Sequence, residues 1–195
     1  MEADWTVALA AGDPVVTVPW AASGECRFVD LRLTPHRIDE IAEARDKTVL
    51  RSALLTLNAP GSLFRTAKCD AWTSSEEDGA APLDAYEMDA SPDEIAFSAG
   101  SYIDLLPIEG ALRCSFERQE RWMRTVIEQL RGTVAKAVRV ELVLRPAEVE
   151  AEAGFAVTWF VEACGATELE ARQRWESAVG LSLMVIMETS ANATR

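Results

Sequence analysis

The chain has 195 residues, 49% of them apolar, and its 32 acidic and 19 basic residues give a formal net charge of −13. A chain of this length buries roughly 70% of the surface that its unfolded state exposes, so one core holds without metals or disulfides. The composition excludes a wholly disordered chain and a fibrous repeat, and we expect one globular domain over residues 1–195.

The N-terminal third is predicted to start with strands and to end with a helix. Short strands are expected at 5–9 and 15–20, separated by a turn of glycine, aspartate and proline, and a third strand follows at 26–33. Thr34 is placed to cap a helix over 35–57, which begins with a proline and keeps helical apolar spacing.

The middle of the chain is predicted to hold two strands joined by an acidic loop. A strand is expected at 64–72, a long loop at 74–94, and an antiparallel partner strand at 95–106. Gly100 is a candidate β-bulge in the second strand. A loop of about 20 residues is long for a compact domain, so it is either functional or disordered.

Two further helices are predicted from their capping residues. Ser115 is expected to cap the start of an amphipathic helix. Gly132 is expected to end this helix by adopting left-handed backbone angles. Thr167 and Glu170 form a capping box that opens a final helix over 168–188.

A hairpin is expected between these two helices. Its strands are predicted at 138–144 and 155–164, with the turn at 146–154, and the tail at 190–195 is expected to fray.

These elements predict an α+β fold. We expect a largely antiparallel sheet of about six strands with three helices on one face, in the order ββα-ββα-ββα. The short sequences RQERW at 118–122 and RQRW at 172–175 are consistent with a weak internal repeat, although chance explains so short a match equally well.

The negative charge is concentrated in one region. Between Cys69 and Leu112 there are eleven acidic residues and no lysine or arginine, which leaves a net charge of −2 for the rest of the chain. Such a field repels nucleic acid phosphates and anionic lipid, so we expect neither as a partner.

The chain is expected to reside in the cytoplasm. The longest strongly apolar stretch, 178–187, has ten residues, whereas a membrane-spanning helix needs about 20. The N-terminus carries an acidic residue where a secretion signal has positive charge.

Neither a metal nor a cofactor is expected. The four cysteines, Cys26, Cys69, Cys114 and Cys164, are widely spaced and predicted to be buried free thiols, and His36 is the only histidine. The sequence lacks the glycine-rich phosphate loops and the serine nucleophile motif.

One face of the predicted sheet is a candidate binding surface. Strand alternation leaves five residues pointing away from the helices on the two middle strands, namely Lys68, Asp70, Trp72, Tyr102 and Asp104. The last hairpin extends this face with Arg139, Glu141, Thr158 and Glu162. The alternative is a solvated sheet face with cross-strand ion pairs. Trp20 and Trp72 are the tryptophans expected to contact a partner.

Weaker candidates for chemistry are the carboxylates Asp70 and Asp104, which would act as an acid and base pair on neighbouring strands with Lys68 lowering one pKa. The acidic loop, with Glu76, Glu77 and Asp78, is a candidate contact for a protein, although a solvated loop explains it as well.

Three functions follow from these observations. The first is a non-enzymatic, inhibitor-like or immunity-like domain that binds a basic protein through the acidic loop and the face around Trp72, Tyr102 and Asp104. The second is a small-molecule binding protein or hydrolase-type enzyme that uses Asp70 and Asp104. The third is a structural homodimer subunit, and a monomer and a homodimer both remain open.

Overall fold

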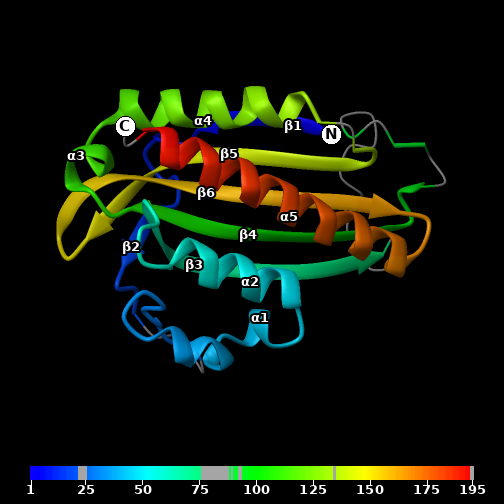
Figure 1. Cartoon of the computed structure of the whole chain (residues 1–195), viewed down its shortest axis with the longest axis horizontal. Coiled ribbons are helices and arrows are strands. Elements are labelled where there is room, and N and C mark those ends of the chain that lie inside the picture. Colours follow the sequence, from blue (N-terminus) through cyan, green and yellow to red (C-terminus); the bar gives the residue numbers. More distant parts are fainter. Residues whose placement is uncertain (22–25, 76–87, 89, 92–93, 134, 194–195) are drawn as a thin grey trace.

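The computed structural model describes residues 1–21, 26–75, 88, 90–91, 94–133 and 135–193 (Figure 1). Within these ranges the chain is α+β, with six helices and an open, mixed sheet of six strands. The strands are β1 (Glu2–Val7), β2 (Val16–Val18), β3 (Phe64–Ser75), β4 (Phe97–Pro107), β5 (Val138–Val149) and β6 (Glu152–Gly165). The helices are the 3-10 helix η1 (Pro35–Glu40), α1 (Ala42–Arg45), α2 (Thr48–Leu57), α3 (Gly110–Arg113), α4 (Phe116–Arg131) and α5 (Glu168–Ala193).

The sheet is only partly antiparallel. Its order is β1-β5-β6-β4-β3, and β2 also pairs with β5. The four long strands pair antiparallel, as expected, whereas β1 and β2 both run parallel to β5. The expected ββα order and largely antiparallel sheet are therefore matched only in part, because β1 and β2 lie one after the other along the same edge.

Pro146 explains why this edge is divided into two strands. The backbone N–H of Ala8 donates to the carbonyl of Leu144 at 2.9 Å. The next bond of a parallel ladder would run from the N–H of residue 146 to Ala8, and proline has no N–H. Pairing stops there and resumes where Val16 lies opposite Ala147.

The three longer helices, α2, α4 and α5, lie on one face of the sheet (Figure 1). Alternate residues of the strands point under them, so Ile103, Trp159 and Val161 are buried with Trp175 of α5. The indole Nε1 of Trp175 donates to the Ser101 hydroxyl at 3.0 Å, which satisfies its polar atom inside the core. No described helix covers the opposite face.

The segment before β3 differs from its prediction. Residues 26–33 are not a strand, because Asp30 forms a turn in which its Oδ1 accepts from the backbone N–H groups of Arg32 and Leu33. The expected helix over 35–57 is divided into η1, α1 and α2. The Thr34 hydroxyl donates to the Asp30 carbonyl instead of capping, and Ile41 has extended backbone angles between η1 and α1.

Helix capping agrees better with its prediction. The Ser115 hydroxyl accepts from the N–H of Arg118 at 3.3 Å, and the Thr167 hydroxyl accepts from Glu170 at 3.2 Å. Two expectations are wrong. Gly132 has a φ of −75° and is not left-handed, and α5 continues past residue 188 to Ala193.

The final turns of α5 are held by a buried contact to α4. Ser190 donates to the Ile186 carbonyl and accepts from the indole Nε1 of Trp122 at 3.2 Å. The part of the tail that the structure describes is therefore helical, and residues 194–195 lie outside the described residues.

The turn between β5 and β6 is shorter than the predicted turn at 146–154. The strands continue to Val149 and resume at Glu152, so Glu150 and Ala151 alone make the turn. Both have positive φ, 50° and 72°, which L-residues with side chains adopt only at a cost.

We predict that Ala151→Gly stabilises the protein by about 1 kcal/mol, because glycine adopts positive φ without a steric penalty. Thermal unfolding should show a rise in Tm of about 2–4 °C. Ala153→Gly is the control, since Ala153 is a strand residue and the same change there should lower Tm. Equal shifts in both variants would contradict the assignment of strain to the turn.

Candidate functional site

Among the residues that the structure describes, the helix-free face of the sheet is covered at one end only. There, buried apolar residues of β2, β4, β5 and β6 form a second, smaller core, made of Val16, Val18, Leu106, Ala147, Val149 and Ala156. Phe28, from the segment after β2, packs against this core, and Trp20 meets Phe28 edge to face at 6.4 Å. The indole Nε1 of Trp20 donates to the Ala67 carbonyl, so Trp20 helps to hold this cover in place.

The other end of the face carries three half-buried aromatic side chains, Trp72, Tyr102 and Phe160, which we call the aromatic strip. Tyr102 and Phe160 lie opposite each other on β4 and β6, with ring centroids 5.7 Å apart. Trp72 lies across the backbone of β4 at Gly100, where an added Cβ would come within 2.5 Å of the indole. The three rings therefore sit on rigid strands.

Gly100 is not a bulge, contrary to its prediction. The register with β6 continues unbroken on both sides of it, and the glycine instead leaves room for the Trp72 indole. The irregularity lies in β3, between Thr66 and Cys69. It places Ala67 against the second core and leaves Lys68 exposed, whereas Thr66 is buried and bonded to Asn58, the C-cap residue of α2.

Three carboxylates surround the aromatic strip, Asp70, Glu141 and Glu162, which we call the carboxylate rim. Asp70 lies opposite Tyr102, and Glu162 lies opposite Gly100. Arg139 brings one positive charge and pairs with Glu141 at 3.3 Å. Burial raises the pKa of Glu162, and the nearby Arg139 lowers it. The rim therefore holds three carboxyl groups and one guanidinium.

Asp104 is on the expected face but is buried rather than available to solvent. Its Oδ1 accepts from the Thr158 hydroxyl at 2.7 Å, and both residues are buried. Burial raises the pKa of Asp104, while the Thr158 bond and the positive charges of Arg145 and Lys68 lower it. Asp70 is exposed and its register partner is Tyr102, so the two carboxylates are diagonal neighbours rather than a directly opposed pair.

A cavity of about 1210 Å³, which we call the edge cavity, lies along the outer strand β3. It is lined by residues of β3, β4, η1, α1, α2 and the segment after β2, among them Trp20, Glu40, Glu43, Lys68, Cys69, Asp70 and Tyr102. The Lys68 ammonium lies 5.4 Å from the centre of the Trp20 ring, a cation–π contact. The edge cavity thus combines two of the residues singled out for chemistry, Lys68 and Asp70.

The thiol and phenol in the edge cavity are poorly suited to proton transfer. Burial raises the pKa of Cys69 to about 12, helped by the charges of Glu43, Asp70 and Asp104. Burial, followed by Asp104 and Asp70, raises the pKa of Tyr102 to about 12. Both groups stay protonated at neutral pH, and a protonated thiol is a weak nucleophile.

Glu76, Glu77 and Asp78 lie outside the described residues, but the C-terminal end of the acidic segment is visible. Met88 is buried beside Ala137 and Cys164, and its carbonyl accepts from the N–H of Ala137 at 3.0 Å. Glu94 bonds Lys136 at 2.6 Å and Arg174 at 2.8 Å. The last part of the predicted loop is thus attached to β6 and α5.

Phe160 is the functional candidate that the sequence interpretation missed. It shares strand parity with Thr158 and Glu162, both placed on the open face, so the same alternation would have identified it.

The four cysteines are free, but two of them differ from expectation. Cys164 is buried and Cys69 is half-buried, whereas Cys26 and Cys114 are exposed. Among the described residues, no group of three or more histidine, cysteine or acidic side chains is arranged to hold a metal ion. None of the described helices has the length and apolar character needed to cross a membrane.

No protein-family model, curated protein or solved structure matches this chain. The site is therefore interpreted from its own geometry.

We predict that Glu94→Gln lowers Tm at pH 7. Hydrogen bonds from Lys136, Ser91 and Arg174 hold the pKa of Glu94 well below its usual range. The charged form therefore adds stability above the ordinary glutamate pKa, about 4.3, and this contribution is lost as the pH falls toward the folded-state value. Thermal unfolding between pH 7 and pH 3 should show the difference from the wild type shrinking on acidification.

Glu176→Gln is the matched control, since Glu176 is exposed on α5 and makes no ion pair with any residue in the described ranges. The predicted role of Glu94 would be contradicted if the decrease in Tm caused by Glu94→Gln stayed constant with pH. It would also be contradicted if this decrease equalled the one caused by Glu176→Gln.

Proposed function

We propose that this chain is a non-enzymatic protein-binding domain that recognises a basic segment of another protein. The observation that carries the proposal is the half-buried aromatic strip on the helix-free face, surrounded by the carboxylate rim. Half-buried aromatic side chains on rigid strands provide contact area at a small cost in conformational entropy, which is why tyrosine and tryptophan dominate protein interfaces.

Charge indicates what kind of partner fits. The rim contributes three carboxylates against the single guanidinium of Arg139, and Glu76, Glu77 and Asp78 follow the last residue of β3 in the sequence. A lysine-rich or arginine-rich segment with apolar side chains would complement both the rings and the carboxylates. An inhibitor or immunity protein that caps a basic enzyme has this chemistry, and we propose that the chain acts in this way in the cytoplasm.

The environments of the polar groups favour binding over catalysis. Asp104 is buried and bonded to Thr158, whereas Asp70 is exposed, and Cys69 stays protonated. A general acid and base pair requires both groups to reach the substrate, and this arrangement leaves only Asp70 accessible.

Peptide display tests the proposal while the natural partner is still unidentified. A random peptide library is selected on the wild-type domain after depletion on Trp72→Ser, so that the surviving peptides depend on the aromatic strip. We expect enriched peptides to carry several Lys or Arg residues together with apolar ones, and their affinity to fall between 50 and 300 mM salt (about 14 to 6 Å in screening length). Trp72→Ser and the double variant Asp70→Asn/Glu162→Gln should each weaken binding by about tenfold or more.

The control is Glu148→Gln, which removes one exposed carboxylate from β5 at a position pointing away from the strip. It should leave binding unchanged within about twofold, as expected for a residue outside the interface. Enrichment of acidic peptides would contradict the proposal. Enrichment of peptides that bind Trp72→Ser as tightly as they bind the wild type would also contradict it.

A second candidate function is small-molecule binding in the edge cavity. The observation that favours it is the cavity itself, in which Lys68 and Asp70 present opposite charges beside the Trp20 and Tyr102 rings. Ligand sites combine an apolar lining with a few polar groups in this way.

We predict that a ligand of the edge cavity raises Tm of the wild type by about 5 °C at a concentration near 100 Kd. Asp70→Asn should abolish this shift in a thermal screen of small metabolites, because Asp70 lines the cavity. Asp104→Asn is the comparison, since Asp104 is outside the lining residues. If a compound raises Tm of both variants by as much as it raises Tm of the wild type, the edge cavity is not its binding site.

A further inference from the structure

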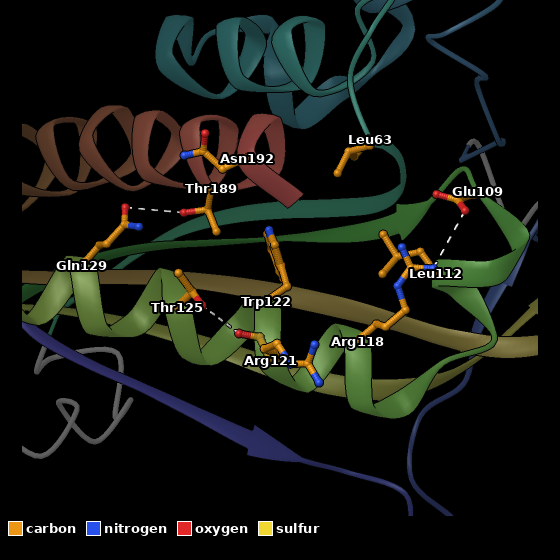
Figure 2. A pocket seen from close by; sticks show the side chains of 10 residues that line it. All are labelled: Leu63, Glu109, Leu112, Arg118, Arg121, Trp122, Thr125, Gln129, Thr189 and Asn192. Atoms are coloured by element: carbon orange, nitrogen blue, oxygen red, sulfur yellow. Dashed lines mark hydrogen bonds and ion pairs between the residues drawn. The ribbon is translucent and has the colours of Figure 1, made fainter. Parts of the chain in front are cut away.

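A second cavity, of about 580 Å³, lies between α4 and the C-terminal end of α5 (Figure 2). We call it the interhelix cavity. It belongs to the helix-covered side of the sheet, so it is separate from the aromatic strip. Its lining residues come from α3, α4, α5 and the segments just before β3 and α3, and they are Leu63, Glu109, Leu112, Arg118, Arg121, Trp122, Thr125, Gln129, Thr189 and Asn192.

The interhelix cavity is locally basic in an acidic protein. Helix α4 carries four arginines and three glutamates, although the chain as a whole has a net charge of −13. Two of these arginines, Arg118 and Arg121, line the cavity, and Glu109 is the one acidic residue among the described residues of its lining. Arg118 meets Glu109 at 3.9 Å, the long end of an ion-pair distance.

Arg121 differs from the other arginines of α4. Arg124 pairs with Glu120 at 2.9 Å, and Arg131 pairs with Asp4 at 3.1 Å. Arg121 forms no ion pair with any residue that the structure describes, and it is one of the lining residues labelled in Figure 2. A guanidinium presents several N–H donors in a planar fork that matches carboxylate and phosphate oxygens.

The rest of the lining offers neutral polar groups above an apolar base. Thr125, Gln129, Thr189 and Asn192 supply hydroxyl and amide groups from the two helices. The Thr189 hydroxyl reaches Gln129 Oε1 only at 3.4 Å, which is long for such a bond.

The apolar base is rigid. Trp122 is fixed by its bond to Ser190 and by the ring of Phe64, 4.9 Å away, and Leu63 and Leu112 lie beside it. Trp122 is therefore held in place before any ligand arrives.

We propose that the interhelix cavity binds a small organic anion, whose carboxylate or phosphate group is held by Arg121 and Arg118 and whose apolar part lies toward Leu63, Leu112 and Trp122. The hydroxyl and amide groups of Thr125, Gln129 and Asn192 bond its remaining polar atoms. This site does not depend on the aromatic strip, so a negative result for one proposal does not affect the other.

The test is a titration of the full chain with phenyl phosphate, followed by the amide NMR shifts of α4 and α5. We expect saturable shifts at residues 118–129 and 189–192 with a Kd of about 1 mM or below, which is reasonable for so small a ligand. Benzoate, run in parallel, distinguishes a carboxylate site from a phosphate site. Benzyl alcohol and benzylamine lack the negative charge and should give no saturable shift.

Arg121→Gln should weaken phenyl phosphate binding by about tenfold or more, as expected for the loss of a charge-assisted contact. Arg124→Gln is the matched control, because it removes the same charge from the same helix outside the cavity, and it should change binding by less than about twofold. The proposal is overturned if Arg124→Gln weakens binding as much as Arg121→Gln, if benzyl alcohol binds as well as the anions, or if neither anion saturates the shifts by about 10 mM.

Discussion

Burial of one face of the sheet under α2, α4 and α5 is the constraint on which the rest of the structure depends. Side chains alternate along a strand, so each residue committed to that core places its neighbour on the opposite face. On β4 and β6 this sends Tyr102, Asp104, Thr158 and Phe160 to the side without helices. The chain covers one end of that side with Phe28 and the second core, and the aromatic strip stands at the other end.

This partial cover explains why residues of one face have different environments. Asp104 and Thr158 lie toward the covered end, where burial forces them to satisfy each other by a hydrogen bond. Asp70 and Trp72 lie toward the open end, where an exposed carboxylate and a half-buried ring are both tolerated. On this face of the sheet, the accessible polar groups named above therefore lie at the open end and in the edge cavity.

Patterns within single elements predicted the long strands, α4 and α5, and they placed Asp70, Trp72 and Tyr102 on one face. The features that these patterns did not predict depend on contacts between residues that are far apart in the sequence. Nothing near residues 2–18 shows that they pair with β5, because Thr6 and Glu141 are 135 positions apart. Gly154 is included in the predicted turn, but it belongs to β6. Glycine fits there because a Cβ added at this position would come within 2.8 Å of the Arg113 side chain. Likewise, only three-dimensional packing leaves Arg121 without an ion pair among the described side chains.

The parallel edge formed by β1 and β2 has a consequence for the order of folding. Strands β3 and β4, and likewise β5 and β6, are successive along the chain, and β4 pairs with β6 across α3, α4 and β5. In contrast, β1 pairs with β5 only after most of the chain has been made. Loop closure costs more entropy as separation grows, and distant contacts form late. The N-terminal edge should then dock last on a sheet that is already assembled, and it should be the first part to detach in local opening. Such an opening would uncover the backbone of β5, so β1 and β2 shield β5 from strand pairing between copies of the chain.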